Sequence, residues 1–470
     1  MHDLSIFLGS ATAQAIGAAI AAGNTSSLAV TAWYLARIAQ YNGGKGGLNC
    51  VRNVSPLALA AASQADAEIA AGQLRGPLHG VPYLLKDNVF TADGSPASAG
   101  CQAIASFVPP HEATLVTRLR NAGAVLLGKT NLTEFADFVA DTMPSEFSGA
   151  GGVVCNPLGW RYERGQGSSV GSAAAVSARL CAFAIGTETQ NSIQAPALHT
   201  SIVGFKPSVG RVSCHGIVPL VPSQDAPGVL ALNVPDAALV LHAMAGAGNA
   251  TMIGSLQGVR IGIPRRFIAD NVLTDSRQAV FERALQSLAQ AGAILIDPCD
   301  LPGAAELHDV RSSVFRTEFK AGLNTLLEQL QPCGMRSMQD IIAWNRDHPE
   351  AIPYGQSLLE AAQASPGLDS PHYLADRQRD KALSLDQGIH AALQAGAADV
   401  LLAPMSAAAK CTGKAGAPVL AIPLGVDADG LPFGVTVFSS PGEDAMVLRV
   451  GERIERLIGR RVQPLSDSMA

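Results

Sequence analysis

Hydrophobic positions in the first part of this 470-residue chain follow helical spacing and then strand spacing. Residues 25–42 place apolar side chains three to four positions apart after Thr and Ser, which is typical of an amphipathic helix that begins at a capping residue. Residues 57–71 are rich in Ala and also predict a helix. We therefore expect residues 1–75 to form N-terminal helices. Residues 76–90 contain a continuous apolar run, which predicts the first core strand.

A helical pattern next to a strand pattern occurs twice more. Residues 114–130 predict a helix, a turn and a strand. Residues 259–297 predict a strand, an amphipathic helix that ends at Gly292, and another strand. Alternation of this kind favours a mixed or parallel sheet with helices on both faces. The expected fold class is therefore α/β, with a core over residues 76–300 built on a large mixed sheet.

The last third of the chain has a different pattern. Residues 301–395 are helical in spacing and richer in charge, so we expect a helical excursion over one face of the sheet. Residues 396–470 return to the core, with a strand at 399–404, a flexible loop at 405–416 and a closing amphipathic helix. The apolar face of that helix carries Val447, Val450, Ile454 and Leu457. No linker-like run of Gly, Ser, Pro or charge interrupts the chain, which favours a single domain over residues 1–470.

Composition narrows the class of function. The chain is 48% hydrophobic and 15% charged, with a net charge of −6, which suits a large core. No basic patch indicates nucleic-acid binding, and no apolar run reaches the roughly 20 residues that span a membrane. The start, MHDLSIFLGS, lacks the features of an export signal, and the eight cysteines show no CxxC spacing. We expect a cytoplasmic protein with reduced thiols and no metal site.

The candidate chemistry centres on residues 165–196, where two serines lie at the ends of one small-residue and Ala-rich unit. They are Ser168, in a Gly-rich turn, and Ser192, in a second turn. A serine hydroxyl needs a base to become a nucleophile, and this stretch contains no His. Lys86 follows an apolar run, and burial can lower a lysine pKa by up to about 3–5 units. Lys86 is therefore a candidate base.

Other interpretations of the same residues are less favourable. Residues 167–171 match G-x-S-x-G, but the polar segment before them does not predict the strand that a nucleophile elbow requires. The Gly-rich turn also lacks the Lys of a phosphate-binding loop. Lys129 and Lys206 follow apolar stretches as Lys86 does, and we interpret both as structural. We also expect Glu134 and Asp225 to hold loops.

The ordered motifs resemble those of the amidase signature hydrolases. The similarity lies in the Gly-rich turn at 165–172, the segment 186–197 and the upstream segment 80–88, GVPYLLKDN. It continues through GKTNLTEFA, VGFKPSVGRVSCHGIVPL, SQDAPG and GAPVLAIPLGVDADGLPFGV, and so covers nearly the whole chain. Residues 338–364 and Glu188 resemble the peptide-amidase branch in particular.

This resemblance implies a role for each matching residue. Ser192 would be the nucleophile, Ser168 a bridging serine after a cis peptide at Gly167, and Lys86 the base. The backbone N–H groups of the oxyanion hole would belong to Thr189, Gln190, Asn191 and Ser192, and the supporting hydrogen-bond partners would be Ser169 and Thr187.

The chain departs from the family pattern around the nucleophile. Gln190 and Asn191 replace paired glycines, Glu188 replaces an Asp, and Gln194 replaces an Arg. Asn adopts a positive φ more readily than Gln does, so we expect a turn of altered shape. Gln190, Asn191 and Gln194 are accordingly candidate substrate contacts.

The resemblance implies a serine-dependent amide hydrolase that acts on a small linear amide through an acyl-enzyme, without metal or cofactor. A carbamate or aryl-amide hydrolase of the same family is an alternative. A second alternative is an ammonia-transferring amidotransferase subunit or an inactive scaffold. We expect a monomer or a homodimer.

Overall fold

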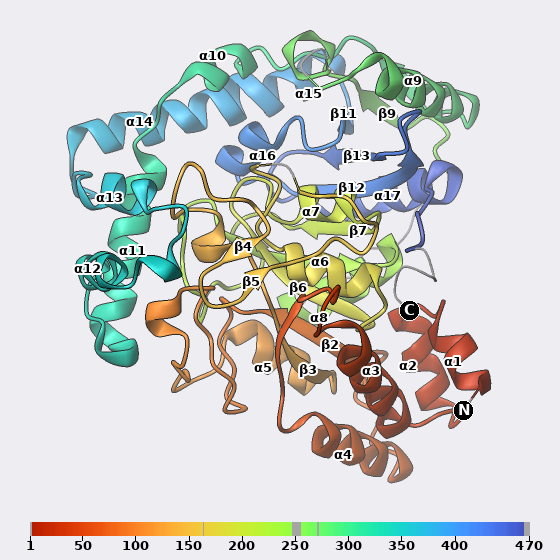
Figure 1. Ribbon diagram of the computed structural model, residues 1–470. Helices are drawn as coiled ribbons and strands as arrows, with labels where there is room; N and C mark the ends of the chain where they lie inside the picture. Colours follow the sequence, from red (N-terminus) through yellow and green to blue (C-terminus); the bar gives the residue numbers. More distant parts are fainter. Residues whose placement is uncertain (1, 163, 247–254, 270–271, 465–470) are drawn as a thin grey trace.

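One large sheet of 11 strands organises the molecule (Figure 1). The computed structural model describes residues 2–162, 164–246, 255–269 and 272–464. The strand order in this sheet is β1-β3-β2-β6-β8-β7-β12-β13-β11-β9-β10, and β4 and β5 form a separate two-stranded sheet. The strands are β1 (Val51–Val54), β2 (Pro82–Lys86), β3 (Val125–Thr130), β4 (Phe147–Ser148), β5 (Gly152–Val153), β6 (Phe183–Glu188), β7 (Val203–Lys206), β8 (Ala226–Ala231), β9 (Arg260–Gly262), β10 (Ile294–Ile296), β11 (Val400–Pro404), β12 (Val419–Val426) and β13 (Pro432–Phe438).

Helices surround the sheet and account for most of the remaining regular structure (Figure 1). Those before residue 300 are α1 (His2–Leu8), α2 (Ala13–Ala21), α3 (Ser27–Tyr41), α4 (Ala58–Ala70), α5 (Thr114–Asn121), α6 (Val170–Ser177), α7 (Gln194–His199), α8 (Val234–Ala245) and α9 (Asp275–Gln290). Those after it are α10 (Ala304–Asp309), α11 (Val314–Leu330), α12 (Met338–Asp347), α13 (Ser357–Gln363), α14 (Pro371–Lys381), α15 (Ala391–Gly396), α16 (Ala409–Ala415) and α17 (Asp444–Ile458). Shorter 3-10 or π segments are η1 (Gln102–Ile104), η2 (Glu134–Ala136), η3 (Arg265–Ala269), η4 (Pro332–Gly334), η5 (Pro349–Ala351) and η6 (Ala382–His390).

The sheet is mixed, as the alternating pattern predicted. Strand β2 pairs in parallel with both β3 and β6, while β6 pairs with β8 in antiparallel fashion. Every residue of β2 and of β6 is buried, which explains their continuous apolar character. Because β2 and β6 are parallel neighbours, their carboxyl ends lie at the same edge of the sheet. Lys86 ends β2 and Glu188 ends β6, so the topology brings these two segments together.

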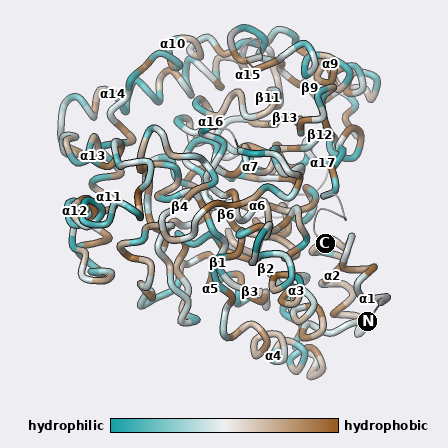
Figure 2. The backbone as a smooth tube through the Cα atoms, viewed as in Figure 1, coloured by the Kyte–Doolittle hydropathy of each residue, from teal (hydrophilic) through white to brown (hydrophobic). Residues whose placement is uncertain are grey.

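The buried residues divide into a main core around the sheet and two smaller clusters. Figure 2 shows brown, hydrophobic segments running through the central strands, and teal is frequent in the outer helices. The helical excursion at 301–395 contains α10–α15, as expected, and the second cluster joins part of it to the rest of the molecule. Phe319 of α11 packs edge-on against Phe135 and Phe138, which come from the segment after β3.

Three details differ from the sequence-based expectations. Residues 51–54, within the segment expected to be helical, form β1 and pair with β3 at one edge of the sheet. Residues 409–415, within the expected flexible loop, form the largely buried helix α16. Leu457 is 38% exposed, although Val447, Val450 and Ile454 of the same helix are buried, because Leu457 lies in the last turn of α17.

The described residues contain no membrane-spanning helix and no candidate metal site. None of their helices has both the length and the apolar character needed to cross a bilayer. No group of three or more His, Cys, Asp or Glu side chains within the described part is placed to bind a metal ion. All eight cysteines are free thiols.

Candidate active site

Lys86 lies at the end of β2 with its side chain fully buried. Its Nζ is hydrogen-bonded to Ser168 Oγ at 2.7 Å. The same amine contacts Thr187 Oγ1 at 3.1 Å and the Thr187 carbonyl oxygen at 3.2 Å. Asn88 Nδ2 donates to Thr187 Oγ1 at 3.0 Å, which holds the threonine hydroxyl in place. The base predicted from sequence therefore contacts the predicted bridging serine directly.

The surroundings of Lys86 favour an uncharged amine. Burial lowers the pKa of Lys86 to about 7, although the carboxylates of Asp225, Glu188 and Asp137 act in the opposite direction. A neutral amine has two N–H donors and one lone pair. In that state the two oxygens of Thr187 can accept from the two donors, which leaves the lone pair to accept from the Ser168 hydroxyl 2.7 Å away. This arrangement can remove a proton from the Ser168 hydroxyl.

Ser168 and Ser169 form the turn that leads into α6. The Gly167–Ser168 peptide is cis, and the Ser168 carbonyl accepts from Thr133 N–H at 3.1 Å. Ser169 Oγ donates to the Thr187 carbonyl and accepts from Thr187 N–H, at 3.1 and 3.3 Å. A Cβ at Gly186 would lie 2.7 Å from Ser169 Oγ, so glycine is needed there for the close approach. The supporting residues predicted from sequence thus contact each other, and Thr187 also contacts Lys86.

Ser192 lies in the turn between β6 and α7 (residues 189–193), named the nucleophile turn for the role predicted for Ser192, and is 6% exposed. Its carbonyl accepts from Ser169 N–H at 3.1 Å, so backbone contact joins the two serine-bearing turns. The N–H groups of residues 189–192 have no acceptor within the part of the chain that the structure describes. Neither Gln190 nor Asn191 has a positive φ, so the turn accommodates both without left-handed backbone. Four consecutive free N–H groups are suited to binding a negatively charged oxygen.

The side chains that replace the family's glycines and arginine are held in different ways. Asn191 Nδ2 donates to the Gly165 carbonyl at 2.5 Å, which ties the nucleophile turn to the Gly-rich turn. Gln194 is buried, and its Nε2 donates to Glu188 Oε1 at 2.8 Å and to the Gln190 carbonyl at 3.1 Å. Gln194 is therefore engaged inside the turn. Gln190 is partly exposed and stays a predicted substrate contact.

A cavity of about 210 Å³ opens beside Thr187 and Thr189. Much of its wall is apolar and comes from residues 217–220 and Pro222, and Asn88, Cys214 and Asp225 also line it. Asp225 accepts from the Thr189 hydroxyl and from the N–H groups of Leu220 and Val221. Burial raises the pKa of the Asp225 carboxyl. Asp225 thus holds one wall of this cavity to the nucleophile turn, a loop-holding role in keeping with the sequence analysis.

Helix α16 packs closely against the nucleophile turn. A Cβ at Gly413 would lie 2.6 Å from the Thr189 carbonyl oxygen and 2.9 Å from the Gln190 Cα. Real Cβ atoms are not found this close to backbone, so only glycine fits between α16 and the turn. The segment 405–416 therefore borders the predicted oxyanion hole as helical structure.

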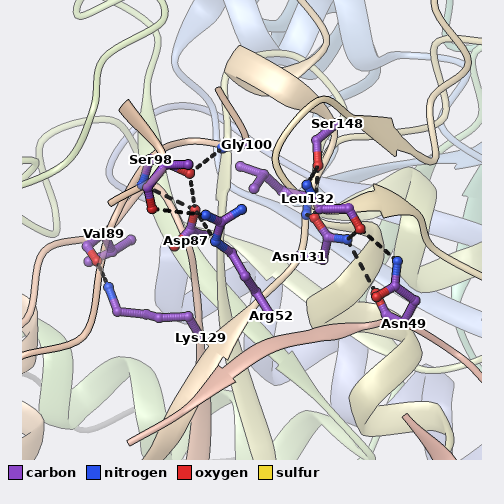
Figure 3. Close-up of polar contacts among 12 residues, drawn as sticks. Asn49, Arg52, Asp87, Val89, Ser98, Gly100, Lys129, Asn131, Leu132 and Ser148 are labelled. Carbon is purple, nitrogen blue, oxygen red and sulfur yellow. Dashed lines mark hydrogen bonds and ion pairs between the residues drawn. The ribbon is translucent and has the colours of Figure 1, made fainter. Parts of the chain in front are cut away.

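Two further buried lysines occupy comparable positions in the sheet. Lys129 of β3 donates to the Val89 carbonyl, close to Asp87 (Figure 3). The Asp87 carboxylate accepts from the Ser98 hydroxyl and faces Arg52. Lys206 of β7 has no hydrogen-bond acceptor among the described residues, and the carboxylates of Glu188 and Asp444 favour its charged form. Burial lowers the pKa of each of these lysines to about 8. Neither contacts Ser168 or Ser192.

Sequence reasoning assigned no role to Asn88 or Gly413. Asn88 directly follows the Lys-Asp pair of the upstream motif, and this proximity to Lys86 was the available signal. Gly413 lies in a segment without a motif, and only the fold brings it to the nucleophile turn.

Comparisons with known proteins identify the family of this chain. Residues 29–414 match the sequence profile of the family described as Amidase. The native peptide amidase of Stenotrophomonas maltophilia is 36% identical, covers 97% of this chain and 98% of its own, and has a TM-score of 0.89. An amidase family protein from Bacillus anthracis is 31% identical, with a TM-score of 0.90 and coverage of 99% and 94%. A glutamyl-tRNA(Gln) amidotransferase subunit of Lachnospira eligens is 31% identical over 504 residues, covering 96% of this chain and 98% of that protein. Since the profile match spans most of the chain, this protein belongs to the amidase family.

Proposed function

We propose that this amidase-family hydrolase cleaves small linear amides with Ser192 as nucleophile, Ser168 as a bridging hydroxyl and Lys86 as base. The observation that carries the proposal is the contact of 2.7 Å between the fully buried Lys86 Nζ and Ser168 Oγ. The free N–H groups of residues 189–192 support it, because they lie in the same turn as Ser192.

In the proposed reaction, neutral Lys86 takes a proton from Ser168 as Ser168 takes one from Ser192. Ser192 Oγ attacks the amide carbonyl, and the N–H groups of residues 189–192 stabilise the resulting oxyanion. The tetrahedral intermediate collapses as Ser168 returns the proton to the leaving nitrogen, which departs as ammonia or an amine. Water then attacks the acyl-Ser192 ester with the same two groups moving the proton. The products are a carboxylic acid and regenerated Ser192.

The cavity beside Thr187 and Thr189 supports a substrate with a compact apolar group. Its volume of about 210 Å³ fits a side chain or short chain rather than a long acyl tail. Similarity to the Stenotrophomonas maltophilia peptide amidase supports the amide of a peptide or peptide-like molecule. Carbamates and aryl amides remain the alternatives, and a panel of primary amides, anilides and carbamates would rank the three. We propose that the chain acts without a partner protein.

Replacement of Ser192 tests the nucleophile. Ser192→Ala should lower kcat by roughly 10⁴-fold or more, because the acyl-enzyme can no longer form. It should also abolish covalent labelling by a fluorophosphonate while the melting temperature stays close to that of the wild type.

The matched control is Ser177→Ala, which removes another buried serine hydroxyl, one that donates to the Thr200 carbonyl away from the site. This variant should retain both activity and labelling. Undiminished turnover in Ser192→Ala would remove Ser192 from the proposed role. A purified wild type that is labelled but needs a second protein for turnover would favour the amidotransferase alternative.

A further inference from the structure

Gln194 connects two parts of the nucleophile turn through a single buried amide. It is the first residue of α7, and its Nε2 reaches both Glu188 Oε1 and the Gln190 carbonyl oxygen. The contact with the Gln190 carbonyl bears on the predicted oxyanion hole, because Gln190 lies within residues 189–192, whose N–H groups are free. A side chain that fixes this carbonyl also fixes the peptide unit that contains it.

The orientation of that peptide determines where the next N–H points. The Gln190–Asn191 peptide is trans, so the Asn191 N–H points away from the Gln190 carbonyl. The carbonyl faces Gln194, and the N–H therefore faces the opposite side. The next peptide is held similarly, because the Asn191 carbonyl accepts from Ala195 N–H at 2.9 Å and the Ser192 N–H points away from α7. Gln194 and the first turn of α7 thus aim two successive N–H groups away from the helix.

Glu188 in turn holds Gln194. Its Oε2 accepts from the N–H groups of Ile193 and Gln194 at 2.7 and 2.9 Å, which leaves Oε1 for the Gln194 side chain. Burial raises the pKa of Glu188, and the neighbouring charge of Lys206 acts in the opposite direction. Both carboxylate oxygens are therefore engaged with α7 and its side-chain amide, and both residues are buried.

We propose that Gln194 is a positioning residue for amide hydrolysis, whose side-chain amide orients the Gln190–Asn191 peptide so that the Asn191 N–H donates to the oxyanion. This inference rests on the proposed function and assigns Gln194 a role in the transition state instead of a contact with substrate. A preorganised donor in an oxyanion hole typically contributes a factor of about 10²–10³ to kcat.

The test compares Gln194→Met, which keeps the length but removes the donor, with Gln194→Arg, which retains donors. Each is assayed with a primary amide and with the matching thioamide, whose sulfur is a weaker hydrogen-bond acceptor than oxygen. Gln194→Met should lower kcat for the oxygen amide roughly 10- to 100-fold, change KM less than about threefold, and reduce the preference for oxygen over sulfur. Gln194→Arg should recover a substantial part of both kcat and this preference.

Gln356→Met is the matched control, because Gln356 is another buried glutamine, whose amide donates to the Ile342 carbonyl in the helical segment. It should lower the melting temperature without changing kcat or the preference for oxygen. Unchanged kcat in Gln194→Met, or a loss of kcat with the same oxygen-to-sulfur ratio as the wild type, would overturn the assignment of Gln194 alone. A wild type that hydrolysed no amide would overturn the proposed function as well.

Discussion

The amines of Lys86 and Lys129 lie on neighbouring parallel strands and have opposite polar surroundings. In the register of β2 and β3, Lys86 pairs with Thr130 and Lys129 pairs with Leu85, so the two side chains leave opposite faces of the sheet. Both side chains are fully buried, and burial lowers both pKa values, to about 7 and about 8. Burial and pKa alone therefore do not separate a base from a structural lysine.

The partners of each amine make the difference. Lys86 meets the hydroxyl of Ser168, a group that can donate a proton to it. Lys129 donates to the Val89 carbonyl and lies near the Asp87 carboxylate (Figure 3). A carbonyl oxygen and an ionised carboxylate can accept hydrogen bonds but have no proton to donate. An amine surrounded by acceptors is held in its protonated form, whereas an amine facing a hydroxyl can exchange a proton with it. A candidate base is therefore identified by the group that faces its lone pair.

Exchanging each lysine for Met gives the largest expected contrast. Lys86→Met should lower kcat by about 10²–10⁴-fold, because no group remains to take the Ser168 proton. Lys129→Met should keep kcat within a few-fold, because Lys129 does not contact either serine. Steady-state kinetics below the melting temperature of both variants measures the difference. Equal losses of kcat in the two variants would contradict this distinction between the two lysines.

Removing the carboxylate beside Lys129 should chiefly affect stability. Asp87 faces Arg52 at 3.5 Å and accepts from Ser98 N–H and Oγ, all in buried surroundings. Asp87→Asn would leave buried cations without a counter-charge, with an expected cost of about 3–5 kcal/mol in the free energy of unfolding. Denaturant titration measures this loss. Adding Lys129→Met to Asp87→Asn should recover part of it, and strictly additive losses would show that the two residues do not interact.

The pH dependence of activity gives the smallest but most direct test of Lys86. Below a pH of about 7, Lys86 becomes protonated and loses the lone pair that faces Ser168. We therefore expect kcat/KM to fall about tenfold per pH unit on the acid side and to level off above the pKa. The Lys129→Met variant should keep the same midpoint. A profile that is flat from pH 5 to pH 9 would argue against a lysine base.

Sequence predicted the mixed sheet and the resemblance to amidases because each has a strong local signal. The apolar strands at 82–86 and 183–188 are buried on both faces, and the serine-bearing turns are dense in motif residues. Strand β1 was not predicted, since it has four residues of which only Val51 is buried, and these lack a clear period. Helix α16 was not predicted either, because Gly413 and its small neighbours suggest a loop until the nucleophile turn is placed beside them.

The candidate site was predictable in its residues but not in its connections. The motifs pointed to Lys86, Ser168 and Ser192, and the fold joins their segments. That Gln194 faces inward could not be read from sequence, because the direction of a side chain at the start of a short helix depends on the preceding turn. The different surroundings of Lys86 and Lys129 depend on strand register, which the apolar runs do not specify.

The close packing of Gly413 against Thr189 and Gln190 has a consequence for protein engineering. Substitutions in residues 405–416 that are made to change substrate preference would displace the backbone next to Ser192 wherever a larger side chain meets it. Changes introduced for selectivity in that segment should therefore also alter turnover. Keeping residue 413 as glycine is the simplest way to separate the two effects.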